Sequence, residues 1–500
     1  MTISTRRIVW FGIGIGLTLL IGGRWNLPAA AWIAPICMLR FFRTSEKPWR
    51  EGVLLWLATA ATAIISWHGA TFLDNVHPLA ESGLFLVTSL IGMLPLVIDR
   101  AYYRRYGSTF WLSFVYPVAV TAIDFLSSGD SPFGSFGAAG YSQRDFLPIM
   151  QLAAITGIWG IGFVIAWFAS LVNYTWDQGF RMTRSLALAG ITLILILGLG
   201  LGRILLPVPS TQVAHIAGFS LPAGTFNRLL PMLRDGNEQG FRQEVEQLHV
   251  AQLNQIRELA QQGANIVVLQ EGAGLGYSDQ VEQLIRAAST IAKEEQIYIV
   301  LPTMAFGPAQ PENIVRIIDP SGSIVLEHIK YGGNQFEGSL KGDGVLHSVD
   351  TPYGRLSAII CWDADFPSII RQAGQQQIDL LFIPANDWLE IKDIHAGMAT
   401  FRAVENGMAI FRQTGQGVSL LTDSYGRVIE RIDTFQQQSS GQFEAVHISE
   451  ARPASVPTLY PHIGDLFGTV MQLAGLGLVV GLLLQRPWRW YRTKALASLG

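Results

Sequence analysis

Residues 356–367 read LSAIICWDADFP. The first five residues form a mostly apolar run, and Cys361 follows it directly. The run from Leu356 to Ile360 is short, apolar and rich in isoleucine, which predicts a buried β-strand. Cys361 therefore follows the carboxyl end of a strand, and open α/β sheets place their functional sites at such ends. This stretch predicts an α/β domain with a cysteine at a candidate site.

Two other chemically active side chains follow apolar strands in the same way. They are Glu271, after residues 266–270, and Lys330, after residues 324–329. Taken singly, such a glutamate or lysine is usually a solvated charge, and such a cysteine is usually a small core residue. The three together favour a functional site, because both residue types are rare in this part of the chain. Cys361 is the only cysteine between residues 207 and 462, and Lys330 is one of four lysines there.

The segment around these three residues alternates predicted strands and helices. Short apolar runs predict strands at 213–219, 265–269, 297–302, 314–319, 323–329, 356–361, 378–383, 409–412, 417–421, 428–431 and 444–448. Longer stretches predict helices at 241–262, 281–293 and 396–406. Strands that alternate with helices predict a layered α/β domain of about 240 residues with its own core.

Long apolar runs occupy both ends of the chain. They lie at 8–23, 28–42, 53–67, 84–98, 110–125, 148–172, 186–206 and 463–484. A helix of about 20 mostly apolar residues crosses the hydrocarbon core of a bilayer, so the second and third runs are short for a full span. The pattern predicts seven membrane spans, a polar segment and an eighth span.

Lysine and arginine are concentrated in alternate short loops, which predicts the orientation in the membrane. The rich loops and the tail carry Arg6, Arg7, Arg43, Lys47, Arg50, Arg100, Arg104, Arg105, Arg181, Arg184, Arg486, Arg489, Arg492 and Lys494, whereas the opposite loops carry Arg24 and Arg144. Cationic loops stay in the cytoplasm. We therefore expect a seven-span domain over 1–206, an extracytoplasmic domain over 207–462, and an eighth span with a basic cytoplasmic tail over 463–500.

Composition excludes several classes of function. Charged residues make up 15% of the chain, against about 25% in soluble domains. The net charge of −3 disfavours a nucleic-acid partner, which would require a basic face. Two cysteines cannot form a disulfide framework or a cysteine-rich metal site, and the nine histidines show no H-x-x-x-H spacing. We expect neither a metal nor another cofactor.

The three strand-end residues suit acyl transfer. A thiol needs a base to become a nucleophilic thiolate, and a carboxylate in a cavity can be that base. An ammonium group and backbone N–H groups can stabilise the oxyanion of a tetrahedral intermediate. Glu271, Lys330 and Cys361 would supply the base, the cation and the nucleophile.

Glu271, Lys330 and Cys361, in this order and spacing, resemble the Glu-Lys-Cys triad of the nitrilase (carbon–nitrogen hydrolase) superfamily. The stretch CWDADFP at 361–367 resembles the cysteine motif of that superfamily, and ANDW at 385–388 resembles its strand-end Asn-Asp. His395 followed by FRAVENG at 401–407 resembles the helix that carries Arg-Ala-x-Glu-x-Gly. The resemblance implies an α-β-β-α sandwich, here inserted between spans seven and eight.

The predicted arrangement resembles that of one branch of the superfamily, the apolipoprotein N-acyltransferases. It consists of seven spans, an external nitrilase domain and an eighth span. The resemblance implies that Cys361 takes an acyl chain from a phospholipid as a thioester and passes it to the α-amino group of a diacylglyceryl-cysteine at a lipoprotein N-terminus. Glu271 would be the proton acceptor and Lys330 the oxyanion donor. Glu337 resembles an additional essential loop glutamate of the branch, and Trp362 and Asp363 would support the site.

Two other functions are compatible with parts of the chain. A membrane-tethered amidase or nitrilase would use the same triad with water as the acceptor, although a single span would be enough to anchor it. A transporter or lipid-binding protein with an inactive domain would carry charges within its spans, and Asp124 is the one clear candidate.

Overall fold

The computed structural model describes residues 3–71, 73, 77–129, 131–209, 212–307, 309–436 and 442–497. The chain divides into two compact units. The helical unit comprises Met1–Ser131, Phe136–Gly202 and Ile463–Gly500, and the sheet unit comprises Pro132–Ser135 and Arg203–His462.

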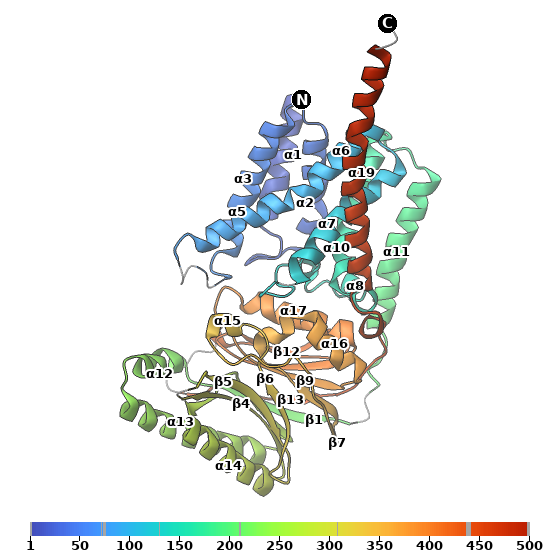
Figure 1. Cartoon of the computed structure of the whole chain (residues 1–500). Helices are drawn as coiled ribbons and strands as arrows, with labels where there is room; N and C mark the ends of the chain where they lie inside the picture. Colours follow the sequence, from blue (N-terminus) through green and yellow to red (C-terminus); the bar gives the residue numbers. More distant parts are fainter. Residues whose placement is uncertain are drawn as a thin grey trace. The chain divides into compact units, whose positions relative to one another are not determined.

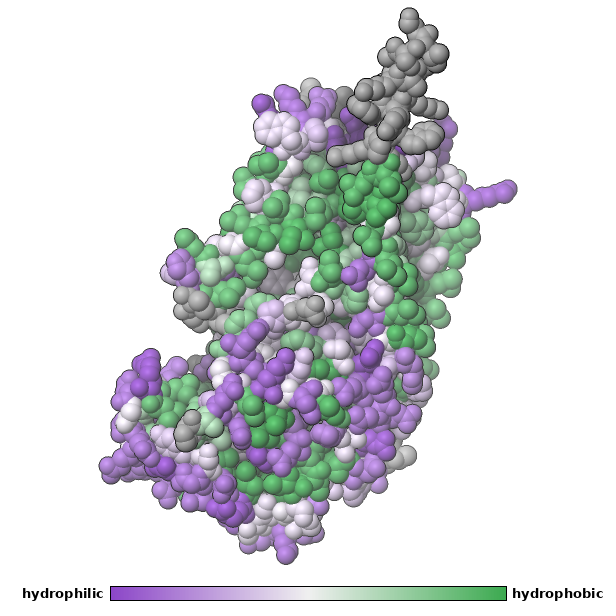
Figure 2. Space-filling model, viewed as in Figure 1, coloured by the Kyte–Doolittle hydropathy of each residue, from purple (hydrophilic) through white to green (hydrophobic). Residues whose placement is uncertain are grey.

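The helical unit is built from the apolar runs at the two ends of the chain (Figure 1). Its elements are α1 (Ile3–Thr18), α2 (Pro28–Arg43), α3 (Pro48–Trp67), α5 (Ala80–Gly92), α6 (Leu94–Tyr106), η1 (Phe110–Phe114), α7 (Val115–Gly129), η2 (Ala139–Gln143), α8 (Leu147–Met150), α9 (Ala153–Thr156), α10 (Ile158–Asp177), α11 (Arg184–Ile204) and α19 (Leu466–Ala497). Figure 2 shows apolar side chains gathered over these helices and hydrophilic ones over the sheet unit.

Within the described residues, five helical segments are long and apolar enough to cross a membrane. They are Ala80–Tyr106, Phe110–Gly129, Ile158–Asp177, Arg184–Ile204 and Leu466–Leu484. Helices α1, α2 and α3 form at the other three predicted runs but are not among these five. Several apolar helices are therefore confirmed, and the count of eight spans stays a prediction.

One predicted run is divided in the structure. Residues 148–172 form α8, α9 and the first part of α10, because Gly157 interrupts the helix with a φ of +62°. Glycine adopts this left-handed conformation without the steric cost that a side chain would add. The long helix of this segment is therefore α10, which begins at Ile158.

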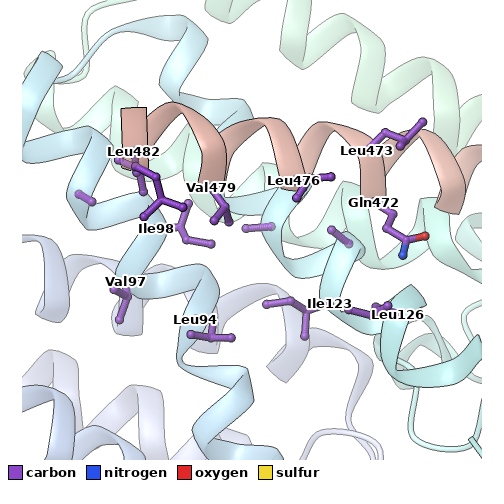
Figure 3. A pocket seen from close by; sticks show the side chains of 15 residues that line it. Leu94, Val97, Ile98, Ile123, Leu126, Gln472, Leu473, Leu476, Val479 and Leu482 are labelled. Atoms are coloured by element: carbon purple, nitrogen blue, oxygen red, sulfur yellow. The ribbon is translucent and has the colours of Figure 1, made fainter. Parts of the chain in front are cut away.

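Helices α6, α7 and α19 line an apolar cavity of about 850 Å³ (Figure 3). Its walls are aliphatic, and Gln472 is the one polar side chain among the described residues that line it. At one edge the helices pack closely, since a Cβ added to Gly475 of α19 would be 2.7 Å from the methyl group of Ala122. The cavity belongs to the helical unit alone.

The sheet unit contains two sheets. The first has the order β13-β1-β2-β4-β5-β6 with β3 beside β4, and the second has the order β12-β11-β10-β9-β8-β7. The strands of the first are β1 (Ala214–Ser220), β2 (Ile266–Leu269), β3 (Gly274–Tyr277), β4 (Tyr298–Phe306), β5 (Glu312–Ile318), β6 (Ile324–Ile329) and β13 (Glu444–Ala451). Those of the second are β7 (Val349–Thr351), β8 (Gly354–Ala358), β9 (Leu380–Asn386), β10 (Ala409–Gly415), β11 (Val418–Thr422) and β12 (Val428–Asp433).

The two sheets pack face to face with helices on their outer faces. The helices are α12 (Thr225–Arg234), α13 (Glu238–Gln261) and α14 (Ser278–Glu295) by the first sheet, and α16 (Pro367–Gln375) and α17 (Lys392–Asn406) by the second (Figure 1). Alternate residues of a strand point to opposite faces. In β2, Ile266 and Val268 pack between the sheets, whereas Val267 and Leu269 pack against α13 and α14.

This double burial explains why β2 and β9 are continuous apolar runs rather than alternating ones. The predicted α-β-β-α sandwich is confirmed for this unit. The sequence patterns do not predict β3, β7, α12 or α16, which are short elements or, in β3, contain two glycines. The ends of β2, β6 and β8 carry the candidate site.

Candidate active site

Cys361 lies at a tight turn where the segment after β8 passes into η3 (Cys361–Asp365). Its φ is +43°, in the left-handed region that residues with a side chain rarely adopt. Such backbone strain costs roughly 1–3 kcal/mol and persists where the surroundings fix it, as at active sites. The residue is 9% exposed, so the turn presents a buried thiol with limited access.

The Asp363 side chain holds this turn in place. Its two carboxylate oxygens accept four hydrogen bonds, from the N–H groups of Tyr331 (2.9 Å), Gly332 (2.7 Å) and Ile360 (3.0 Å) and from Nε2 of His328 (2.8 Å). Two of these donors follow Lys330 and one precedes Cys361. Asp363 therefore ties the turn of the cysteine to the loop after the lysine.

Lys330 follows β6 directly and is almost completely buried. Its Nζ donates a hydrogen bond of 2.7 Å to Oε1 of Glu271, which lies two residues after the end of β2. Asn313 of β5 donates from Nδ2 to the same oxygen at 2.9 Å, and its carbonyl accepts the N–H of Lys330 at 3.0 Å. Three strands of one sheet thus converge on the Glu271 carboxylate.

Glu337 also hydrogen-bonds Nζ of Lys330. It is the last residue of the short helix α15 (Asn334–Glu337), and about a third of its side chain is exposed. Nδ2 of Asn334 holds the loop closed by donating to the carbonyls of Lys330 (3.0 Å) and Leu340 (2.9 Å). The Lys330 ammonium is therefore held between two carboxylates.

An aromatic stack covers the loop beside the cysteine. The ring of Phe336 in α15 stacks on Trp362 with 5.7 Å between centroids, and Phe133 stacks on Phe336 at 5.4 Å. Gly333 makes room for this stack, since an added Cβ would lie 2.5 Å from the Trp362 ring. Phe133 belongs to the four-residue segment Pro132–Ser135, so a loop between helices α7 and η2 contributes to the sheet unit.

Burial raises the pKa of the Cys361 thiol to about 12, and the Glu271 carboxylate adds to the rise. Burial by itself would lower the pKa of Lys330, but Glu271 and Glu337 outweigh it and raise that pKa above its usual value. Burial also raises the pKa of Glu337. At neutral pH the resting site therefore holds a neutral thiol and an ammonium group, and the thiol requires a base.

A second set of charged side chains lies close to the cysteine. His395 of α17 hydrogen-bonds Oδ1 of Asp387 through Nδ1 at 3.0 Å, and its Nε2 lies 3.4 Å from Oδ2 of Asp365. Arg412 of β10 donates from Nη2 to both oxygens of Asp387, at 2.9 and 2.8 Å. Sγ of Cys361, a ring nitrogen of His395 and a carboxylate oxygen of Asp387 all lie within 4.8 Å of one another.

A thiol, an imidazole and a carboxylate at this spacing are also the ligand types of zinc. Both oxygens of Asp387 already accept hydrogen bonds from the Arg412 guanidinium, and Oδ1 also bonds Nδ1 of His395, so this carboxylate is fully engaged. We interpret this set as a hydrogen-bonded network around the cysteine.

The structure brings Glu271, Lys330 and Glu337 into direct contact and places Trp362 and Asp363 against the loop that carries Glu337. The sequence patterns predict no role for Asn313, which lies in a strand that also carries Glu312 and Arg316. They also predict no role for the His395 network, although the motifs that contain Asp387 and precede residues 401–407 are present in the sequence.

Two family models match the chain. Residues 237–452 match the carbon-nitrogen hydrolase model, and residues 14–171 match the model of the apolipoprotein N-acyltransferase N-terminal domain. An apolipoprotein N-acyltransferase of Geobacter metallireducens is 23% identical over 91% of this chain and 91% of its own length. One of Pseudomonas aeruginosa is 26% identical over 60% of this chain and 61% of its own length.

Other relatives match a smaller share of the chain. The omega-amidase of Mus musculus is 25% identical over 42% of this chain and 88% of its own length. Among solved structures, an amidase from Nesterenkonia is 17% identical, covers 50% of this chain and 93% of its own, and has a TM-score of 0.37. The two family models together cover both the helical and the sheet unit. This chain belongs to the apolipoprotein N-acyltransferase family of the carbon–nitrogen hydrolase superfamily.

Proposed function

We propose that this protein transfers an acyl chain from a phospholipid to the α-amino group of a diacylglyceryl-cysteine at the N-terminus of lipoproteins. The observation that carries the proposal is the presence, in one chain, of an acyltransferase N-terminal domain and a hydrolase-type domain with a buried cysteine. The omega-amidase relative matches 42% of this chain over 88% of its own length. Hydrolysis of a soluble amide by water does not require a set of apolar helices.

In the proposed first step, the Glu271 carboxylate accepts the proton of the Cys361 thiol, and the thiolate attacks the ester carbonyl of the phospholipid. The carbonyl π electrons move to the oxygen, and the Lys330 ammonium stabilises this oxyanion. When the intermediate collapses, the ester C–O bond breaks and the lysophospholipid leaves with the proton held by Glu271. Cys361 then carries the acyl chain as a thioester.

In the second step, the neutral α-amine of the lipoprotein attacks the thioester. Glu271 accepts a proton from the nitrogen, and Lys330 stabilises the second oxyanion. The C–S bond then breaks to give the amide, and the departing sulfur takes the proton from Glu271, which restores the thiol and the carboxylate. The buried ion pair between Lys330 and Glu271 supports these roles, because it places the base and the oxyanion donor side by side. Glu337 would hold the ammonium from its other side, and the N–H of Trp362 would be a second oxyanion donor.

Both substrates of this reaction are bilayer lipids, which accounts for the apolar helices. We propose that eight spans anchor the chain in the cell (inner) membrane, that residues 207–462 form the catalytic domain on the extracytoplasmic (periplasmic) side, and that the basic tail is cytoplasmic. The alternation of cationic loops supports this orientation.

The test is mass spectrometry of lipoprotein N-termini from cells depleted of this protein and complemented with variants. The wild-type chain should restore N-acylated cysteine, whereas Cys361→Ala should leave a free α-amine. Cys361→Ser should be nearly as inactive, because a serine hydroxyl is much harder to ionise than a thiol. Full N-acylation with Cys361→Ala would disprove the mechanism. Release of free fatty acid by the purified wild-type protein, without amide formation, would instead indicate a hydrolase.

A further inference from the structure

His395 has no role in the two steps above, yet its ring lies beside the reacting sulfur. The ring nitrogen, Sγ of Cys361 and an oxygen of Asp387 form a cluster with all separations within 4.8 Å. All three residues are buried. A polar ring that is buried at a nucleophile can exchange a proton or a hydrogen bond with it.

The partners of His395 determine its charge. Nδ1 hydrogen-bonds Oδ1 of Asp387 at 3.0 Å, whereas Nε2 lies 3.4 Å from Oδ2 of Asp365 without a hydrogen bond between them. Burial alone would favour the neutral ring, but the two aspartates and the Cys361 side chain raise the pKa of His395 well above its usual value. His395 is therefore an imidazolium at neutral pH, with two N–H donors.

The partners of Asp387 keep that carboxylate charged. Although burial acts to raise the pKa of Asp387, Arg412 and His395 outweigh it and hold the pKa below its usual value. Arg412, in the central strand β10, thus fixes Asp387, and Asp387 fixes the ring of His395. A charge that is paired and hydrogen-bonded in this way can remain in a buried site.

We propose that His395 is a further catalytic residue, whose protonated ring donates a hydrogen bond to Sγ of Cys361 and stabilises the thiolate that forms when Glu271 takes the proton. The thiol is then faced by two cations, Lys330 and His395, and by two carboxylates, Glu271 and Asp387. The S–H bond breaks, the proton moves to Glu271, and the imidazolium keeps its own protons. The inference rests on the proposed role of Cys361 as the nucleophile.

The network around His395 also explains how the buried Cys361 thiol can ionise. The positive charge of Lys330 is shared with Glu271 and Glu337, so it is only partly available to a thiolate. The burial that restricts access to Cys361 also opposes its ionisation. A second cation close to the sulfur, the His395 imidazolium of α17, offsets this cost.

The test is the rate at which methyl methanethiosulfonate modifies Cys361 in the full-length protein, measured against pH by mass spectrometry. Cys37→Ala serves as the background, so that a single cysteine remains. The rate follows the thiolate fraction. A hydrogen bond to a charged group corresponds to about a 10- to 100-fold change in that fraction, so His395→Asn should slow modification by this factor at each pH below the thiol pKa.

A matched control is His249→Asn, which removes another buried histidine of the sheet unit, one that bonds the carbonyl of Leu275 instead of the thiol. It should leave the modification rate within about twofold of the parent. His395→Gln provides a second variant of neutral charge and larger volume, in case the asparagine variant is recovered poorly. Each protein is compared as its monodisperse folded fraction.

An unchanged modification rate in folded His395→Asn or His395→Gln would overturn the proposal. This measurement needs neither a phospholipid nor a lipoprotein. An unchanged rate would therefore leave acyl transfer through Cys361 standing, and a failure of acyl transfer would leave the role of His395 in thiolate formation standing.

Discussion

At the scale of single residues, the site consists of one thiol among charges of both signs. Glu271 and Lys330 form a buried hydrogen bond of 2.7 Å, and Asn313 donates to the same carboxylate oxygen at 2.9 Å. Removing one member of such a pair leaves the other buried and uncompensated. Variants of these residues therefore need both an activity measurement and a stability measurement.

The roles of Glu271 and Lys330 can be separated by the step that each variant blocks. In single-turnover transfer from a labelled phospholipid, Glu271→Gln should slow formation of the Cys361 adduct about 10²–10⁴-fold, because the amide cannot accept the thiol proton. Lys330→Met should slow both adduct formation and its transfer to the amine about 10²–10³-fold, since both steps pass through an oxyanion.

Exposed residues of the same unit provide the controls for this experiment. Glu282→Gln changes an exposed ion pair with Arg286, and Lys341→Met changes an exposed lysine, so both variants should transfer at the parental rate. An adduct that forms at the normal rate in Glu271→Gln would show that another group is the base, and Glu337 would then be the next residue to test.

Asp387 predicts a pH-dependent contribution to stability. Its pKa is lowered in the folded protein, so the stabilisation is present above the unfolded value of about 3.9 and is lost as the pH falls. At pH 7, Asp387→Asn should destabilise the sheet unit by about 3–5 kcal/mol, because Arg412 stays buried without its anion.

The measurement for Asp387→Asn is thermal melting of the full-length protein at neutral and at acidic pH. The difference from the parent should shrink as the pH drops below about 4, where the parent loses the same charge. Asp350→Asn, in an exposed pair with Arg355, should change the melting temperature little at either pH. A loss of stability for Asp387→Asn that is equally large in acid would contradict the electrostatic explanation.

At the scale of elements, the loop after β6 determines where Glu337 lies. The four-residue helix α15 is flanked by Gly333 and Gly338, with φ of +79° and +70°. Both positions require the left-handed backbone, but only Gly333 faces the Trp362 ring. The two glycines thus allow backbone strain to be distinguished from steric contact with the aromatic stack.

Alanine substitutions exploit this difference. Each should cost roughly 1–2 kcal/mol from the left-handed backbone. Gly333→Ala should in addition displace α15, because its Cβ would be 2.5 Å from the Trp362 ring, and should thereby separate Glu337 from Lys330 and reduce acyl transfer. Gly338→Ala meets no atom within 4 Å and should retain most activity. Equal activity in the two variants would mean that the position of α15 is irrelevant to the reaction.

At the scale of the whole molecule, the two units differ in the hydropathy of their surfaces. Figure 2 shows the apolar side chains gathered over the helical unit. The sheet unit is an ordinary α-β-β-α sandwich, with one core between its sheets and others beneath its helices. The positive-inside rule converts the distribution of lysine and arginine into an orientation.

Labelling with an impermeant maleimide tests this orientation in intact cells. In the Cys37→Ala background, Glu258→Cys places a thiol on an exposed position of α13 and should be labelled from outside. Ala495→Cys, in the basic tail, should be labelled only after the cells are permeabilised. Cys361 is only 9% exposed, so the parent gives a low background. Labelling of the tail but not of α13 in intact cells would place the catalytic domain in the cytoplasm and exclude access to exported lipoproteins.

Elements with unambiguous patterns could be predicted from the amino-acid sequence. Strands such as β2 and β9 are apolar on both faces because both faces are buried, and this makes them visible as short continuous runs. The apolar helices at the chain ends are equally visible because lipid requires about 20 apolar residues in succession. The motif around Cys361 indicated the superfamily, and their positions after apolar strands predicted Glu271 and Lys330 as further site residues.

Tertiary structure decided what lies around those residues, because the contacts join positions far apart in the chain. Asn313 reaches Glu271 across 42 positions, and Asp387 meets Arg412 across 25. No local periodicity encodes such pairs, since they depend on strand order and on the register of β2, β4 and β5 in one sheet and of β9 and β10 in the other. The division of the run at 148–172 and the second cation beside Cys361 likewise became visible only when the chain was folded.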